Sequence, residues 1–213
     1  RVVLSPASHA SYYPGAKVMT MKVVFEKDTW KLLGAQIVGT EGVDKRLDVL
    51  ATAMHAGMKA NMLKDLDLAY APPFSSAKDP VNMAGFMIEN IRNGFVKQYH
   101  WDEIAGLPRD GSVTLLDTRT AYEYKSGHID GYINIPVDDL RERMNEIDDS
   151  KPVYVICQSG LRSYIACRIL TQNGFDCYNF SGGYRFYATV IKEKKMSEYT
   201  YPCGMEKLKA QWK

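Results

Sequence analysis

The chain has 213 residues, of which 46% are hydrophobic and 24% charged, and its formal net charge is +2 at neutral pH. This composition is typical of one large or two small globular domains, and it excludes a disordered chain, a collagen and a coiled-coil rod. No apolar run approaches the roughly 18 residues of a membrane-spanning helix, and the small, mixed charge gives no basic surface for nucleic acid or an anionic membrane.

The first half of the chain is predicted to contain a two-stranded antiparallel hairpin. Hydrophobic and polar residues alternate over residues 17–25, and an apolar run at residues 30–38 follows the polar turn at residues 26–28. Alternation with a period of two is typical of strands, and a short polar connection is typical of a hairpin.

Two helices are predicted to follow the hairpin. The first is indicated by apolar residues at helical spacing: Val43, Leu47, Leu50, Ala51 and Met54. The second is predicted to begin at Asp79 and Pro80, because aspartate caps helices well and proline suits the first helical position. The stretch between them, residues 68–76, contains two prolines and is not expected to be helical.

The second half alternates short strands with helices. Strands are predicted at residues 113–117, 132–135, 153–156 and 175–178, and helices at residues 119–125, 137–146, 161–172 and 184–194. This alternation with short connections indicates βαβ units around a mainly parallel sheet. The boundary between the two halves is expected near residues 94–100, and the chain beyond residue 192 is charged and aperiodic.

The strongest chemical signal is Cys157, which directly follows the apolar run of residues 153–156. A loop with Gly160 and a predicted helix come next, so the thiol would lie at the C-terminal end of a parallel strand and at a helix N-terminus. Backbone N–H groups and the helix dipole favour a thiolate there, and Arg162 adds a positive charge. Such a thiolate suits attack on an anionic or sulfane-sulfur donor. The alternative is a buried cysteine that only packs in the core.

The other cysteines are expected to be unreactive. Cys167 lies beside the apolar stripe of a predicted helix and Cys177 lies within a predicted strand, whereas Cys203 lies in the tail without an activating neighbour. No cysteine pair has C-x-x-C spacing and no histidine pair has zinc spacing, so no metal site is predicted. Reduced thiols and the lack of a recognisable signal sequence indicate a cytoplasmic protein.

The second half resembles the rhodanese family. The resemblance is carried by residues 115–119, Glu123, residues 127–136, the C-x-x-G-x-R-S loop at residues 157–163 and the Ser-Gly-Gly turn at residues 181–183. It implies a sulfurtransferase with an α/β rhodanese-like fold, in which Cys157 takes up a sulfane sulfur as a persulfide and passes it to an acceptor. The loop residues implied to hold this sulfur are Gln158, Ser159, Gly160, Leu161, Arg162 and Ser163.

Three further residues match the rhodanese signature, namely Asp117, Arg119 and His128. Their simpler role is structural, as caps and ion pairs that fix the loops, and this role is favoured over a direct one. A cysteine-type phosphatase is disfavoured, because only four residues separate Cys157 from Arg162. A loop this short suits sulfur transfer better than the binding of a phosphate.

The first half resembles the dimerisation domain of pyridine nucleotide-disulfide oxidoreductases, in the coenzyme A-disulfide reductase and NADH oxidase branch. Residues 9–16 and residues 70–82 carry the resemblance. It implies an α+β domain that pairs with a second copy of the chain. Tyr12 and Tyr70 would then reach the substrate sulfur in the partner subunit's active site, or would serve only as interface anchors. Tyr13 is an alternative to Tyr12.

Together the two resemblances predict a dimerisation domain at residues 1–95, a rhodanese-like domain at residues 96–194 and a tail at residues 195–213. They imply the C-terminal part of a longer flavin-dependent reductase of coenzyme A disulfide, persulfide or polysulfide, and a first residue other than methionine fits such a piece. FAD, NAD(P)H and coenzyme A are implied for the longer protein. None is expected in this chain, because it has no G-x-G-x-x-G turn.

The function expected from the sequence is therefore rhodanese-type sulfur transfer through Cys157. The donor would be thiosulfate, a polysulfide or coenzyme A persulfide, and neither nucleic acid nor a membrane is an expected partner. A second hypothesis is a non-catalytic module that dimerises and serves as a docking or sensor unit of the oxidoreductase.

Overall fold

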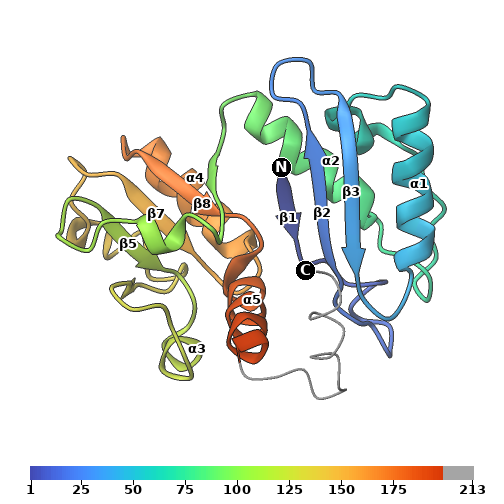
Figure 1. Ribbon diagram of the computed structural model, residues 1–213. Coiled ribbons are helices and arrows are strands. Elements are labelled where there is room, and N and C mark those ends of the chain that lie inside the picture. The colour runs from blue at the N-terminus through green and yellow to red at the C-terminus, as the bar shows by residue number, and fades with distance from the viewer. Residues whose placement is uncertain (199–213) are drawn as a thin grey trace, which may run out of the picture.

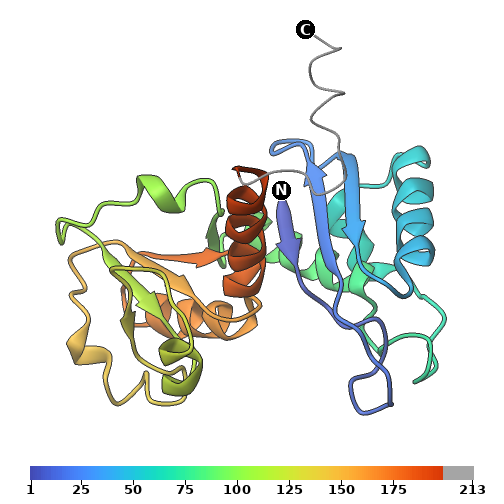
Figure 2. The same cartoon turned by 60° about the horizontal axis from the view of Figure 1, so that its bottom comes forward.

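The computed structural model describes residues 1–198, so most of the expected tail, with Cys203, lies outside the described residues. Two lobes, each built on its own β-sheet, lie side by side, and α5 (Gly183–Glu198) stands between them in both views (Figures 1 and 2). None of the described helices is long and apolar enough to cross a membrane.

The first lobe contains an antiparallel sheet in the order β1-β2-β3. Its strands are β1 (Val2–Leu4), β2 (Thr20–Phe25) and β3 (Leu32–Val38). The predicted hairpin is confirmed as β2 and β3, in a register that pairs Met21 with Ile37. The sequence analysis did not predict β1, because all three of its residues are buried and show no alternation.

Helices cover one face of this sheet. They are α1 (Val43–His55), the 3₁₀ helix η1 (Ala60–Asp65) and α2 (Pro80–Arg92). The prediction for α2 is confirmed, because the Asp79 side chain accepts the Val81 N–H at 3.0 Å and caps the helix.

The predicted buried stripe of α1 is wrong in part. Leu47 and Met54 are 38% and 42% exposed, whereas the buried residues of this helix are Arg46, Leu50 and Ala53. The face is rotated because the Arg46 guanidinium is buried as an ion pair with a carboxylate of another segment, a long-range contact that an apolar pattern does not contain.

The second lobe contains an entirely parallel sheet in the order β4-β8-β7-β5-β6, which confirms the predicted architecture. Its strands are β4 (Lys97–Tyr99), β5 (Thr114–Asp117), β6 (Ile133–Asn134), β7 (Val153–Ile156) and β8 (Cys177–Phe180). The region of β4 lies within the boundary predicted at residues 94–100. The structure uses it as an edge strand against β8.

Two longer helices and several short ones surround this sheet. They are η2 (Ile104–Gly106), α3 (Ala121–Lys125), η3 (Met144–Glu146), α4 (Leu161–Gln172) and α5. The helix predicted at residues 137–146 is wrong except for η3. Backbone hydrogen bonds from Asp139 N to Pro136 O and from Glu142 N to Asp139 O close four-residue turns instead, and this segment still buries Leu140.

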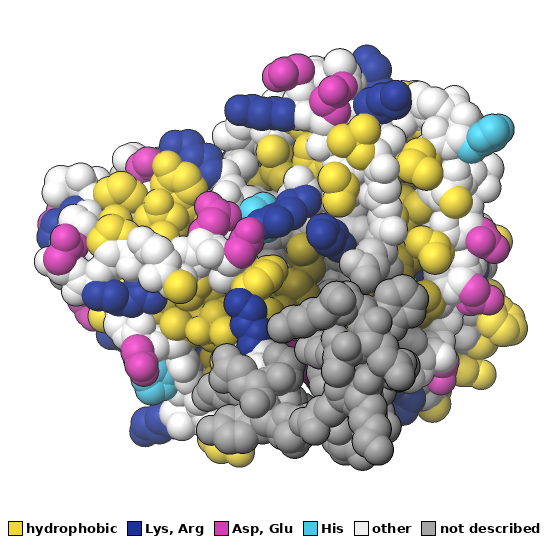
Figure 3. Space-filling view, in the orientation of Figure 1, with side chains coloured by type: hydrophobic (Ala, Val, Ile, Leu, Met, Phe, Trp, Pro, Cys, Tyr) yellow, Lys and Arg dark blue, Asp and Glu magenta, His cyan; other side chains and the backbone are white. Residues whose placement is uncertain are grey.

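The lobes contact each other through backbone and side-chain hydrogen bonds. The Val3 N–H donates to Ser181 Oγ at 2.8 Å, and Arg168 Nη1 donates to the Phe95 carbonyl at 2.9 Å. Arg1 forms an ion pair with Asp102. On the face drawn in Figure 3, charged side chains of both signs are scattered over the lobes, and hydrophobic side chains gather in the hollow between them.

Candidate active site in the cysteine loop

The cysteine loop, residues 157–163, connects the end of β7 to the first turn of α4. Cys157 is fully buried, and its Sγ accepts hydrogen bonds from the Gly160 N–H at 3.1 Å and from Ser163 Oγ at 3.2 Å. Gly160 precedes the helix with a φ of 101°, which favours glycine. Two hydrogen-bond donors and a helix N-terminus therefore surround the sulfur.

The first turn of α5 holds the cysteine loop through backbone hydrogen bonds. The Tyr184 N–H donates to the Cys157 carbonyl at 2.8 Å, and the Arg185 N–H donates to the Gln158 carbonyl at 3.1 Å. Gly183 has a φ of 72°, and a Cβ on it would lie 2.5 Å from Ser159 N. The sequence analysis did not assign this support to Tyr184 and Arg185, although the preceding Ser-Gly-Gly turn was the available signal.

Arg162 is held by a carboxylate. Its Nη1 and Nη2 contact the two oxygens of Glu123 at 2.7 and 2.6 Å, which is a bidentate ion pair between α4 and α3. Hydrogen bonds from Arg162, and secondarily from Thr120, lower the pKa of Glu123 to about 2. The positive charge expected in the loop is therefore balanced by a neighbouring negative charge, which the sequence analysis had not predicted.

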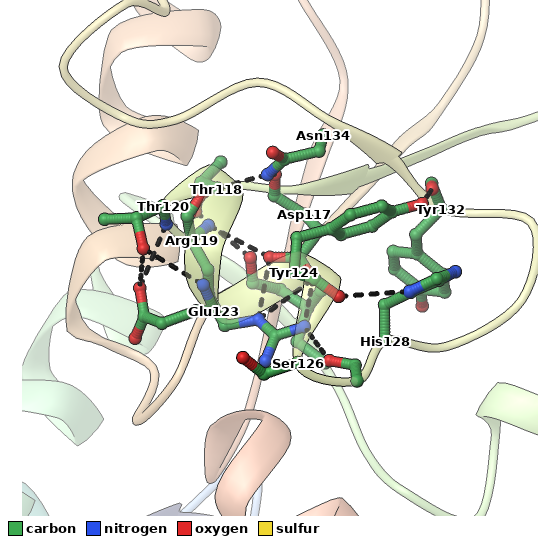
Figure 4. Close-up of polar contacts among 12 residues, drawn as sticks. Asp117, Thr118, Arg119, Thr120, Glu123, Tyr124, Ser126, His128, Tyr132 and Asn134 are labelled. Atoms are coloured by element: carbon green, nitrogen blue, oxygen red, sulfur yellow. Dashed lines mark hydrogen bonds and ion pairs between the residues drawn. The ribbon is translucent and has the colours of Figure 1, made fainter.

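Asp117 and Arg119 form a buried ion pair at the end of β5, shown in Figure 4. Arg119 Nη2 lies 2.7 Å from Asp117 Oδ2 and donates to the Gly127 carbonyl at 2.8 Å. The guanidinium also lies 3.9 Å from the ring centre of Tyr184, in the first turn of α5. These contacts join the segment around α3 to the helix that supports the cysteine loop.

His128 lies apart from this ion pair. Its Nδ1 is 3.1 Å from the Tyr124 carbonyl oxygen, and its ring stacks on that of Tyr124 at 4.0 Å (Figure 4). The interactions described for His128 thus order the turn after α3 and do not reach the cysteine loop.

Tyr12 and Tyr70, which are 58 positions apart in the chain, are brought together in the first lobe. Their hydroxyl oxygens lie 2.7 Å apart, and their residues are 74% and 48% exposed. This hydrogen bond raises the pKa of Tyr70. Tyr13 points elsewhere and packs edge-on against His9. The structure therefore joins Tyr12, and not Tyr13, to Tyr70.

A buried ion pair that the sequence analysis missed fixes the segments that carry these tyrosines. Arg46 Nη2 contacts Asp79 Oδ2 at 2.9 Å and donates to the Ser8 carbonyl at 2.8 Å. Ser75 Oγ donates to the same Asp79 oxygen at 2.7 Å, and the Ala10 N–H donates to the Ser75 carbonyl at 2.9 Å. The only signal for this pair in the sequence was an arginine inside a predicted helical face.

Two other cysteines lie in the core of the second lobe. Cys167 and Cys177 are buried and unbridged. Burial, together with a hydrogen bond to Cys177, raises the pKa of the Cys167 thiol well above its usual range. Hence, of the cysteines that the structure describes, Cys157 is the one whose surroundings favour a nucleophile.

The described residues do not fit a resident dinucleotide or metal. Three turns lead from a parallel strand into an α-helix, after β5, β7 and β8. The first two hold a buried Asp–Arg pair and a thiol, and the third is the Ser-Gly-Gly turn at residues 181–183. None of the three has the G-x-G-x-x-G pattern that binds a pyrophosphate. Within the described range, no group of three or more His, Cys, Asp or Glu residues is arranged to hold a metal ion.

Comparison with known proteins identifies both lobes. Residues 1–81 match the pyridine nucleotide-disulphide oxidoreductase dimerisation domain, and residues 100–189 match the rhodanese-like domain. Coenzyme A disulfide reductase of Staphylococcus epidermidis is 44% identical over 85 residues, which are 40% of this chain and 19% of that protein.

Two solved structures resemble both lobes together. The reduced CoADR-RHD of Bacillus anthracis is 47% identical with a TM-score of 0.87, over 90% of this chain and 34% of that one. A NAD-dependent persulfide reductase from A. fulgidus is 39% identical with a TM-score of 0.77, over 87% and 33% of the two chains.

The chain therefore spans about a fifth of the curated relatives and about a third of the similar structures. It carries a pyridine nucleotide-disulphide oxidoreductase dimerisation domain followed by a rhodanese-like domain, as both resemblances predicted.

Proposed function

We propose that the second lobe transfers sulfane sulfur through a persulfide on Cys157. The observation that carries the proposal is the pair of donors on its Sγ, the Gly160 N–H and the Ser163 hydroxyl, at the N-terminus of α4. These donors stabilise negative charge on sulfur, which is the form that both attacks the donor and leaves when the persulfide is consumed.

The reaction consists of two displacements at sulfur. With thiosulfate as the donor, the Cys157 thiolate attacks the sulfane sulfur, a new S–S bond forms, the donor S–S bond breaks, and sulfite leaves with the bonding electron pair. A nucleophilic acceptor such as cyanide or a thiolate then attacks the outer sulfur of the persulfide. That S–S bond breaks, and its electron pair returns to Cys157 as the thiolate, so the protein is neither oxidised nor reduced overall.

Intact mass spectrometry after incubation with thiosulfate, and separately with polysulfide, tests this proposal. We expect an adduct of one sulfur atom that is absent from Cys157→Ser and present in Cys167→Ala, with sulfur transfer to cyanide abolished only in the first variant. Failure of both donors to form the adduct would overturn the proposal and favour the docking or sensor role, which the complete burial of Cys157 also supports.

The longer reaction sequence is also a proposal. We propose that the persulfide is consumed by a flavin-dependent reductase of coenzyme A disulfide, persulfide or polysulfide in the cytoplasm. Its FAD, NAD(P)H and coenzyme A would be held by domains outside this chain. The support is the similarity to a coenzyme A disulfide reductase and a NAD-dependent persulfide reductase. Tethering the two activities would make the sulfur handover effectively intramolecular.

We further propose that the first lobe pairs with a second copy of the chain, with the Tyr12–Tyr70 pair at the contact. The match to a dimerisation domain supports this, as do side chains such as Phe74, which is 72% exposed. Sedimentation velocity should show a dimer that Phe74→Asp weakens and that Met62→Asp, at another exposed site in this lobe, does not.

A further inference from the structure

A cavity of about 430 Å³ lies at the junction of the two lobes. Met83, Phe86 and Met87 of α2 line it from the first lobe, whereas Ser159, Gly160 and Leu161 line it from the second. Its volume falls within the range of about 300–1,000 Å³ typical of small-molecule sites, and its walls are mostly apolar, as in such sites.

Three residues of the cavity wall each carry a buried side-chain oxygen that has no hydrogen-bond partner. Six buried side-chain oxygen or nitrogen atoms lack a partner among the described residues, and three of them belong to residues that line this cavity: Ser5 Oγ, Gln98 Oε1 and Asn179 Oδ1. Asn179 is only 2% exposed. Buried oxygens without a partner are destabilising, and these three belong to residues around one cavity. The oxygens themselves have almost no accessible surface, so they accept hydrogen bonds from an occupant when their side chains turn towards it.

A positive charge lies beside the apolar wall. Lys78 also lines the cavity, and its Nζ lies 5.3 Å from the ring centre of Phe86. From the apolar wall, the unpartnered oxygens and this ammonium, we infer that the cavity binds a small organic anion with an apolar body and an N–H or O–H donor.

The cavity lies against the cysteine loop, because Ser159, Gly160 and Leu161 line it. The Gly160 N–H donates to Cys157 Sγ, and the Gly160 carbonyl accepts a hydrogen bond from Asn179 Nδ2 at 3.4 Å. The other side-chain atom of this amide, Asn179 Oδ1, lacks a hydrogen-bond partner. Cys157 itself does not line the cavity. Three residues of its loop, Ser159, Gly160 and Leu161, do line the cavity, so the occupant lies next to the proposed sulfur site. Its binding is measured without sulfur transfer and does not rest on that proposed function.

Two dyes that differ by one sulfonate test the inference. 8-Anilinonaphthalene-1-sulfonate has the apolar body, the N–H donor and the anion, whereas N-phenyl-1-naphthylamine lacks only the anion. Fluorescence titration of the whole chain should show one saturable site for each dye. Lys78→Gln should weaken the sulfonate dye about three- to tenfold and the neutral dye less than about twofold.

Variants in the wall assign the site. Met83→Trp, which fills the cavity, should weaken both dyes at least about tenfold, and Gln98→Met, which removes the unpartnered oxygen, about three- to tenfold. Met62→Trp, outside the cavity, should change neither. If Met83→Trp and Gln98→Met both bind the two dyes as tightly as the unchanged protein does, the proposed site is wrong, whatever the outcome for sulfur transfer. Equal weakening of the two dyes by Lys78→Gln would overturn the anionic ligand class.

Discussion

Each lobe contains one buried arginine–aspartate ion pair, and the two pairs support different kinds of surface. Arg119–Asp117 contacts Tyr184, whose N–H supports the loop of the buried Cys157. Arg46–Asp79 fixes the segments of Tyr12 and Tyr70, which are exposed. The same kind of ion pair thus orders the surroundings of a buried thiol in one lobe and a pair of exposed tyrosines in the other.

The largest expected effect tests whether the two pairs are equivalent. Asp117→Asn and Asp79→Asn should each lower the free energy of unfolding by about 3–5 kcal/mol, because each leaves a buried guanidinium without its counterion. Urea unfolding measures this loss. Asp148→Asn removes an exposed ion pair with Lys151 and should leave the unfolding midpoint nearly unchanged.

Sulfur transfer should separate the two variants. When the rate is corrected for the folded fraction, Asp117→Asn should lower it and Asp79→Asn should not, because only the first pair reaches Tyr184 and the cysteine loop. Equal losses in both variants would show that the lobes do not act separately.

A steric change in the second lobe should have the next largest effect. In Gly183→Ala the new Cβ would lie 2.5 Å from Ser159 N and 2.6 Å from the Gln158 carbonyl oxygen, so the cysteine loop must move. We expect a loss of about 100-fold in kcat/KM for thiosulfate, as for a misplacement of about 1 Å.

Gly174→Ala is the matched control for this change. Gly174 also has a positive φ, of 92°, but a Cβ there meets nothing within 4 Å. Both variants carry a similar backbone cost of about 1–2 kcal/mol, and only Gly183→Ala should lose activity. Activity retained in Gly183→Ala would mean that α5 does not position the loop.

A smaller effect is expected from the partner of Arg162. Glu123→Gln keeps the helix-capping role of this side chain and removes its charge, which frees the positive charge of Arg162 for an anionic donor. KM for thiosulfate should fall about three- to tenfold, with little change for the uncharged diallyl trisulfide. The same change for both donors would rule out an electrostatic role for this pair.

The smallest expected effect is a pH dependence located at the junction. Burial, the largest cause, and nearby positive charge lower the pKa of His100 from 6.5 to about 4. The unfolded chain therefore binds this proton first, and stability is complete above about pH 6.5 and falls progressively as the pH drops towards 4. The depressed pKa of Glu123 has its effect only between about pH 4.5 and 2.

Urea midpoints at pH 7, 5.5 and 4.5 measure this dependence, and His100→Gln should reduce the difference between pH 7 and 4.5. If the difference in urea midpoint between pH 7 and 4.5 is the same in His100→Gln, the acid sensitivity comes from groups other than His100.

The sequence was most informative where neighbours in the chain are neighbours in space. The cysteine loop, the cap of α2 by Asp79 and the strand–helix order of the second lobe follow from local patterns, and the structure shows them as expected. The misses involve distant partners. β1 and β4 are short strands defined by pairing, and Arg46 is buried only because Asp79, 33 positions away, neutralises it.

The face of α1 and the cavity at the junction were missed for the same reason. Leu47 fits an apolar stripe as well as Leu50 does, and the choice between them is made by an ion pair across the lobe. Asn179 lies one residue beyond the strand predicted at residues 175–178, whereas the structure places it inside β8, at a cavity that α2 and the cysteine loop also line. No pattern in the sequence indicates that its side-chain oxygen lacks a hydrogen-bond partner.

The hydrogen bond from Val3 to Ser181 joins residues 178 positions apart. During synthesis from the N-terminus, β1 is made first, but this hydrogen bond cannot form until residue 181 has also been synthesised. The amide groups that support the cysteine loop, at residues 184 and 185, emerge directly after Ser181. Neither the junction contact nor the support of the cysteine loop can therefore form before residues 181–185 have been synthesised, and a chain interrupted before this point carries Cys157 without that support.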